Sequence, residues 1–99
     1  MYKIEKKTSG YLLTFGGLID ETEMTKWVKE SEEALKTAPA TFGVIVDMRE
    51  LKPLTPEAQA IMVNGQGLYK QKGMQRSAVI LANAVLTFQF KRLAQQSGI

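Results

Sequence analysis

The sequence predicts an α/β protein with a four-stranded mixed sheet packed by three helices. Short apolar or alternating segments are interspersed with segments of helical periodicity, in the order β-β-α-β-α-β-α. The two β-α-β units imply right-handed crossovers between parallel strands, and the first strand supplies an antiparallel edge. A chain of 99 residues, of which 44% are hydrophobic, fits one domain over residues 1–99.

The first two strands form a predicted hairpin that leads into a helix. In residues 2–7 apolar side chains alternate with charged ones, and residues 11–15 form the second, more apolar strand. Asp20 is the predicted N-cap of the first helix, with Glu23 three residues later in a capping-box arrangement. Pro39 ends this segment. The predicted buried stripe of the helix consists of Met24, Trp27, Val28, Ser31, Ala34 and Leu35.

Two further strands flank the second helix. Residues 42–48 and 76–82 are apolar at successive positions, which predicts strands that are buried on both faces. The helix between them begins at Thr55, a good N-cap followed by proline, and runs to about residue 71. Gly65 lies on its apolar stripe at a cost of about 1 kcal/mol relative to alanine, so we expect the helix to approach the sheet closely there. The stripe consists of Ala58, Ile61, Met62, Gly65, Leu68 and Tyr69.

A third helix is predicted near the C-terminus, from a cap at or near Asn83 through Gln96. Its inward stripe consists of Leu86, Phe90, Leu93 and Ala94. Val85 and Phe88 fall outside this stripe, and an exposed phenylalanine is apolar surface of the kind that binds a partner. We therefore predict a homodimer that associates through Val85 and Phe88. The alternatives are that a twisted helix end buries these two side chains, or that Phe88 is a tolerated exposed residue.

The residue inventory excludes several kinds of chemistry. The chain has no cysteine and no histidine, which excludes disulfides, thiolate metal sites, serine–histidine catalysis and histidine-ligated zinc. A Mg²⁺ or Ca²⁺ site built from Asp20 and Asp47 lacks a second acidic neighbour at ligand spacing. We expect no metal, no cofactor and no enzymatic activity.

The net charge of +3 is unevenly distributed. Residues 1–48 hold six basic and eight acidic side chains, whereas residues 49–99 hold seven basic and two acidic ones. The basic residues are dispersed without interleaved aromatic residues, so we expect no nucleic-acid partner. The N-terminus lacks the apolar core of a signal peptide, and no stretch approaches the roughly 18 apolar residues of a membrane span. We expect a cytoplasmic protein without a membrane span.

Polar side chains are predicted to gather where the parallel strands end, which is where open α/β sheets bind ligands. This candidate surface for a partner or ligand consists of Asp20, Asp47, Arg49, Thr55, Glu57 and Asn83. The alternative is a local role for each residue. Asp20, Thr55 and Asn83 then cap helices, and Asp47 accepts hydrogen bonds from amides of the following turn.

Four segments carry a resemblance to a known family. Residues 16–20 (GGLID), 46–51 (VDMREL), 70–73 (KQKG) and 97–99 (SGI) resemble, in order and spacing, segments of the STAS domains, the anti-sigma-factor antagonist family. The resemblance covers nearly the whole chain and implies the STAS fold as one domain. It places the chain in a divergent branch of STAS/SEC14-like proteins.

The resemblance also implies a function. In STAS domains an Asp-Ser-Ser-Gly motif begins a helix, and a partner kinase phosphorylates its second serine. Thr55, Pro56, Glu57 and Ala58 fall on this motif, so both serine hydroxyls are absent. The expected function is a non-catalytic regulatory or protein-binding module that phosphorylation does not switch. The alternative is a carrier or sensor of a small apolar ligand or lipid, which needs a cavity of about 300 Å³ or more.

Overall fold

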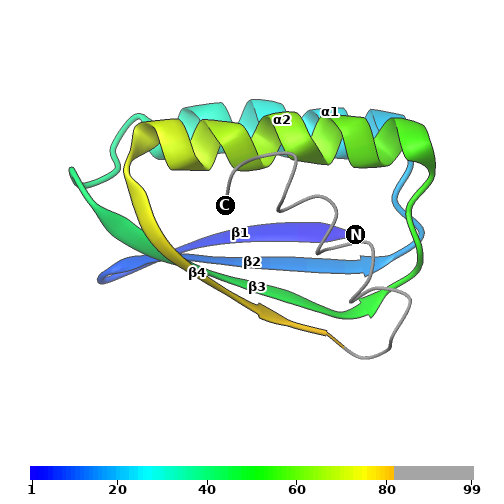
Figure 1. Cartoon of the computed structure of the whole chain (residues 1–99), viewed down its shortest axis with the longest axis horizontal. Helices are drawn as coiled ribbons and strands as arrows, with labels where there is room; N and C mark the ends of the chain where they lie inside the picture. The colour runs from blue at the N-terminus through cyan, green and yellow to red at the C-terminus, as the bar shows by residue number, and fades with distance from the viewer. Residues whose placement is uncertain (82–99) are drawn as a thin grey trace.

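The computed structural model describes residues 1–81, so the third predicted helix, with Asn83, Val85 and Phe88, lies outside the described residues. The described chain has the order β-β-α-β-α-β (Figure 1). The elements are β1 (Tyr2–Lys7), β2 (Gly10–Gly17), α1 (Glu21–Leu35), β3 (Phe42–Leu51), α2 (Pro56–Lys72) and β4 (Met74–Ile80). None of the helices in residues 1–81 is long and apolar enough to cross a membrane.

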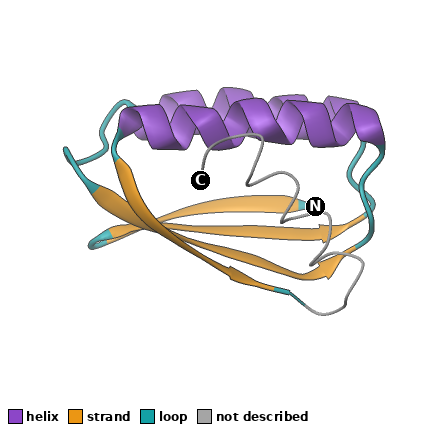
Figure 2. Ribbon diagram, in the orientation of Figure 1, coloured by secondary structure: helices purple, strands orange, loops and turns teal. Residues whose placement is uncertain are grey.

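The four strands form one mixed sheet in the order β1-β2-β3-β4. β1 pairs antiparallel with β2, and β2, β3 and β4 are parallel. The predicted mixed sheet with an antiparallel edge is therefore confirmed. Both crossover helices, α1 and α2, pack beside each other on the same face of the sheet (Figures 1 and 2). This placement follows from two right-handed crossovers that advance in the same direction along the sheet.

The core lies between this helix pair and the sheet. Trp27 of α1 is 1% exposed and stacks on Tyr69 of α2, with ring centroids 5.9 Å apart and planes inclined by 12°. Phe15 of β2 meets the same indole edge to face at 5.2 Å. These three aromatic side chains join the two helices to the sheet, because such pairs add about 0.5–1.5 kcal/mol beyond the area that they bury.

Gly65 permits a close contact, as predicted, but with a different neighbour. A Cβ atom at Gly65 would lie 2.1 Å from Cζ3 of Trp27 and 2.5 Å from its Cη2. The glycine therefore brings α2 against the side chain of α1, and the expected close approach to the sheet is wrong. The helix ends at Gly73, whose φ of 123° favours glycine and whose amide bonds back to the last turn of α2.

The sheet presents two different faces. Alternate side chains of β2 and β3 point toward the helices and are buried, among them Leu13, Phe15 and Val44. The opposite face is not covered by any helix within residues 1–81, and Ile45 is 49% exposed there. The prediction that residues 42–48 and 76–82 are buried on both faces is therefore wrong for the described part of the chain.

We call this surface, which no helix within residues 1–81 covers, the open face. The strand register and the alternation of side chains define its members. They are Lys3, Glu5, Lys7, Gly10, Leu12, Thr14, Gly16, Gly43, Ile45, Asp47, Arg49, Glu50, Arg76, Ala78 and Ile80.

Candidate functional site

Two of the predicted surface residues are helix caps. Asp20 has extended backbone geometry, and its Oδ1 accepts a hydrogen bond from the amide of Glu23 at 2.9 Å. Thr55 is also extended, and its Oγ1 accepts from the amide of Ala58 at 3.2 Å. Both bonds satisfy amides that the first turn of a helix leaves without an intrahelical partner. The local role predicted for these two residues is confirmed.

The capping box at the start of α1 is incomplete. Glu23 forms an ion pair with the terminal ammonium of Met1, whose nitrogen lies 2.8 Å from Oε2. The same ammonium donates to the carbonyl of Gly16 at 2.7 Å, and the amide of Gly16 donates to the carbonyl of Met1 at 2.8 Å. Glu23 therefore links the N-terminus of the chain to α1, a long-range contact that the local motif does not predict.

Asp47 and Arg49 form a two-pronged ion pair. Nε of Arg49 donates to Oδ1 of Asp47 at 3.1 Å, and Nη2 donates to Oδ2 at 2.9 Å. The amide of Arg49 donates to Oδ1 as well, at 3.1 Å, in agreement with the local role predicted for Asp47. The side-chain hydrogen bonds from Arg49, followed by the backbone bond, lower the pKa of Asp47 below its ordinary value.

The position of this pair differs from the prediction. Asp47 and Arg49 were expected at the loop that ends the third strand, but β3 continues to Leu51. Asp47 lies opposite Thr14 and Ile80 in the strand register, on the open face. The two charged side chains lie two positions apart on one strand. Each compensates the charge of the other, which favours their place in the sheet.

The remaining predicted residues fall into two groups. Glu57 is exposed in the first turn of α2, where the positive end of the helix dipole favours its charge. It stands at the same end of the molecule as the cap of α1, because both helices follow the carboxyl ends of parallel strands (Figure 1). Asn83 and the self-association pair Val85 and Phe88 lie outside the described residues.

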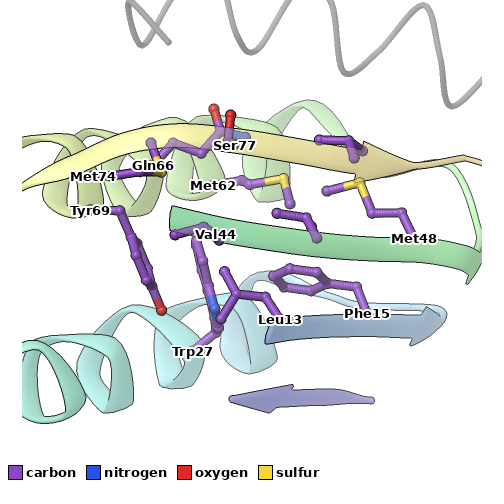
Figure 3. A pocket seen from close by; sticks show the side chains of 12 residues that line it. Leu13, Phe15, Trp27, Val44, Met48, Met62, Gln66, Tyr69, Met74 and Ser77 are labelled. Atoms are coloured by element: carbon purple, nitrogen blue, oxygen red, sulfur yellow. The ribbon is translucent and has the colours of Figure 1, made fainter. Parts of the chain in front are cut away.

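A small apolar cavity lies between the helices and the sheet (Figure 3). Its volume is about 30 Å³, enough for roughly two water molecules. Trp27 lines it, and the indole Nε1 is a buried donor without a hydrogen-bond partner in the described structure. The lining residues are Leu13, Phe15, Trp27, Val44, Val46, Met48, Met62, Gln66, Tyr69, Met74, Ser77 and Val79.

A polar contact that includes Tyr69, one of the lining residues, joins the two helices. The hydroxyl groups of Ser31 on α1 and Tyr69 on α2 are hydrogen-bonded at 2.8 Å. Burial raises the pKa of Tyr69 to about 12, although the bond to Ser31 acts in the opposite direction. Both hydroxyls are thereby satisfied inside the core, which assigns this pair to the packing of α1 against α2.

Three large apolar side chains are exposed at positions that were not predicted as part of a surface. Leu18, in the loop between β2 and α1, is 79% exposed, and Ile45 and Ile80 on the open face are 49% and 41% exposed. Leu18 follows two glycines and precedes a helix cap, so its position in a loop was readable from the sequence. The exposure of Ile45 and Ile80 could not be predicted from the sequence, because the pattern of apolar residues in a strand is the same whether or not another element covers them.

The described residues offer little for metal or acid–base chemistry. Residues 1–81 contain no group of three or more aspartate or glutamate side chains placed to hold a metal ion. The carboxylates of Asp20 and Asp47 each have a local hydrogen-bond partner. What the arrangement does provide is a rim at the helix starts, formed by the polar residues Asp20, Thr55 and Glu57 with the exposed Leu18. The open face adjoins this rim, with Arg49 at that end.

Comparisons with known proteins add no assignment. No known protein family matches the chain, and no curated protein matches its sequence. The resemblance to STAS domains therefore stays a prediction, as does the third helix that the STAS fold implies.

Proposed function

We propose that this chain is a non-catalytic protein-binding module of the STAS type, which binds its partner constitutively through Arg49, Glu57 and the neighbouring rim. The observation that carries the proposal is that three of the candidate polar side chains are hydrogen-bonded to groups two or three residues away in the chain. Asp20 and Thr55 cap helices, and Asp47 holds Arg49. Groups engaged in this way shape a surface, whereas general acids and bases need a free group aimed at a substrate.

The first turn of α2 supports the proposal that phosphorylation does not switch this module. The oxygen of Thr55 already accepts from the amide of Ala58, and Pro56 occupies the first helical position. Glu57 supplies one permanent negative charge where the STAS motif gains about two on phosphorylation. The partner-binding surface thus has a fixed charge.

The alternative, a carrier of a small apolar ligand or lipid, finds less support. Ligand cavities of that kind measure about 300–1,000 Å³ and enclose most of the ligand. The apolar cavity between the helices and the sheet has a volume of about 30 Å³, and a larger hollow of about 430 Å³ lies open on the opposite face of the sheet. Two of the residues that line the apolar cavity, Trp27 and Tyr69, are stacked on each other with ring centroids 5.9 Å apart.

Affinity capture from the source cell with matched variants tests the proposal. The wild-type chain is compared with the double variant Arg49→Glu/Glu57→Lys and with Lys29→Glu, a control on the exposed side of α1. We expect a protein that the wild type and the control capture and that the double variant loses, with circular dichroism verifying its fold. The proposal is wrong if no protein is distinguished in this way, or if the chain is isolated with a stoichiometric lipid.

A further inference from the structure

β1 forms one edge of the sheet, and no strand within residues 1–81 pairs with its outer side (Figure 1). Met1 and Gly16 exchange two backbone hydrogen bonds across the β1–β2 ladder, at 2.7 and 2.8 Å. Hydrogen-bonded and non-hydrogen-bonded pairs alternate along an antiparallel ladder, so the amides and carbonyls of Tyr2, Ile4 and Lys6 point away from β2. The outer side of β1 is therefore a template for one more strand.

A second copy of β1 can pair antiparallel with this edge, about a two-fold axis perpendicular to the sheet. All three outward residues form hydrogen-bonded pairs when the axis passes through Ile4. Ile4 then lies opposite its own copy, and Tyr2 lies opposite Lys6 of the second copy. Between these pairs, Lys3 lies opposite Glu5 of the second copy, and the two-fold axis repeats this contact. The register therefore places opposite charges opposite each other at two positions.

The neighbouring registers are unfavourable. If the axis passes through Lys3, two lysines lie directly opposite each other, and Lys6 has no partner in the ladder. If it passes through Glu5, two glutamates lie opposite each other, and Tyr2 is left without a strand partner. Like charges directly opposite each other destabilise a pair of strands, whereas opposite charges stabilise it. The charge pattern of β1 thus selects the register centred on Ile4.

The side of this edge that faces the helices offers a second match of charge. An open hollow of about 640 Å³ lies beside Tyr2 and α1. The charged residues that line it are Asp20, Glu23, Lys26 and Glu30. Three carboxylates thus stand against Lys26 and the terminal ammonium of Met1, which pairs with Glu23. Lys6 of the second copy, opposite Tyr2, can exchange its exposed contact with Thr37 for these carboxylates.

We propose that two copies of this chain form a homodimer by pairing their β1 strands in the register centred on Ile4. The two four-stranded sheets then form one continuous sheet, with the helices of both copies on the same face. A second copy is the occupant of the edge because Lys3 and Glu5 make the strand complementary to itself. Arg49 of β3 and Glu57 of α2 lie on elements away from this edge, so the dimer leaves the proposed partner surface free.

Reversal of the two charges tests the register. Sedimentation equilibrium of the 99-residue chain at high micromolar concentration should show a dimer. Lys3→Glu or Glu5→Lys replaces two attractive contacts by two repulsive ones, and each should weaken the dimer by about tenfold or more. In an equimolar mixture, the acidic residues of one variant lie opposite the basic residues of the other, so a heterodimer should form. Lys72→Glu, an exposed charge reversal on α2, should leave the dimer intact.

Hydrogen exchange of the wild-type chain gives a second readout that needs no substitution. In the dimer, the outward amides of Tyr2, Ile4 and Lys6 donate to the second copy and are protected. Their exchange should slow as the protein concentration rises from the monomeric into the dimeric range. The amides of Lys3 and Glu5 donate to β2 within the same chain, so their exchange should depend less on concentration.

The inference is wrong if the wild-type chain is a monomer at high micromolar concentration, or if its outward amides exchange at a rate independent of concentration. It is also wrong if both charge reversals leave the dimer intact, or if the mixture of the two variants forms no heterodimer although circular dichroism shows that both are folded. A dimer that only Phe88→Glu dissociates would place the interface on the predicted third helix. Capture of a partner through Arg49 and Glu57 is independent of these outcomes.

Discussion

Gly65 and Gly67 lie two residues apart on α2 and should respond oppositely to the same substitution. In a helix, alanine is favoured over glycine by about 1 kcal/mol, and this gain applies at both positions. Nothing lies within 4 Å of a Cβ atom at Gly67. We therefore expect Gly67→Ala to raise the free energy of unfolding by about 0.5–1 kcal/mol.

At Gly65 the same methyl group collides with Trp27. Its Cβ atom would lie 2.1 Å from Cζ3, and the indole cannot withdraw freely because it is stacked on Tyr69 and packed against Phe15. Overpacking of this kind costs about 1–3 kcal/mol. Since the helix-propensity gain is common to both variants, the difference in stability between them equals this cost, about 1–3 kcal/mol.

Urea unfolding followed by circular dichroism measures the difference. In a domain of this size 1 kcal/mol corresponds to about 4–8 °C in the unfolding midpoint, so a thermal scan would also resolve it. Trp27 is the single tryptophan of the chain, and its fluorescence reports whether the indole has moved. In a Trp27→Leu background the difference should vanish, because the colliding ring atoms are gone. A Gly65→Ala variant as stable as Gly67→Ala in the wild-type background would refute the packing argument.

Three further outcomes are expected. Thr55→Ala should lower the free energy of unfolding by about 1 kcal/mol in denaturant titrations, because the helix loses its cap. Intact-mass analysis of protein from its native cell should show no phosphate at Thr55, and a phosphorylated population would contradict the proposal of a surface with a fixed charge. Burial raises the pKa of Tyr69 to about 12 in the folded chain, above the value of about 10 for an exposed tyrosine, so the free energy of unfolding should fall as the pH rises from 10 toward 12, by up to about 1.4 kcal/mol per pH unit. A Tyr69→Phe variant with the same dependence on pH would refute this. If Val85 and Phe88 mediate a dimer, Phe88→Glu should yield a monomer in light scattering, and an intact dimer would exclude that interface.

Helix starts were predictable from the sequence because capping is local chemistry. Asp20 and Thr55 each accept from an amide three residues ahead, so a short motif contains both partners. The apolar stripes were predictable for a similar reason, since helical spacing alone brings Trp27 or Tyr69 onto one side of its helix. The element that packs against a stripe is far away in the sequence, so helical spacing does not identify it. The prediction therefore placed Gly65 against the sheet, whereas it lies against Trp27 of α1.

The sequence was a poorer guide to which faces of a strand are covered by other elements. Val44, Ile45 and Val46 form a continuous apolar run, yet the first and third are buried and Ile45 is half exposed. Coverage of a face depends on strand order and crossover handedness, which place α1 and α2 together. β3 also continues past the predicted end at residue 48 to Leu51, because Glu50 and Leu51 pair with Gly16 and Gly17 of β2, a contact that apolar patterning does not reveal.

β3 carries apolar side chains on both faces, although no helix within residues 1–81 covers one of these faces. Selection for folding alone would favour polar side chains where water is the neighbour, as on the solvated face of an antiparallel sheet. β3 instead places Ile45 there, two residues from Gly43, where a Cβ atom would meet only the carbonyl oxygen of Arg76, at 3.9 Å. Packing within residues 1–81 therefore does not account for the apolar side chains of this face, and strand propensity does not account for its glycine.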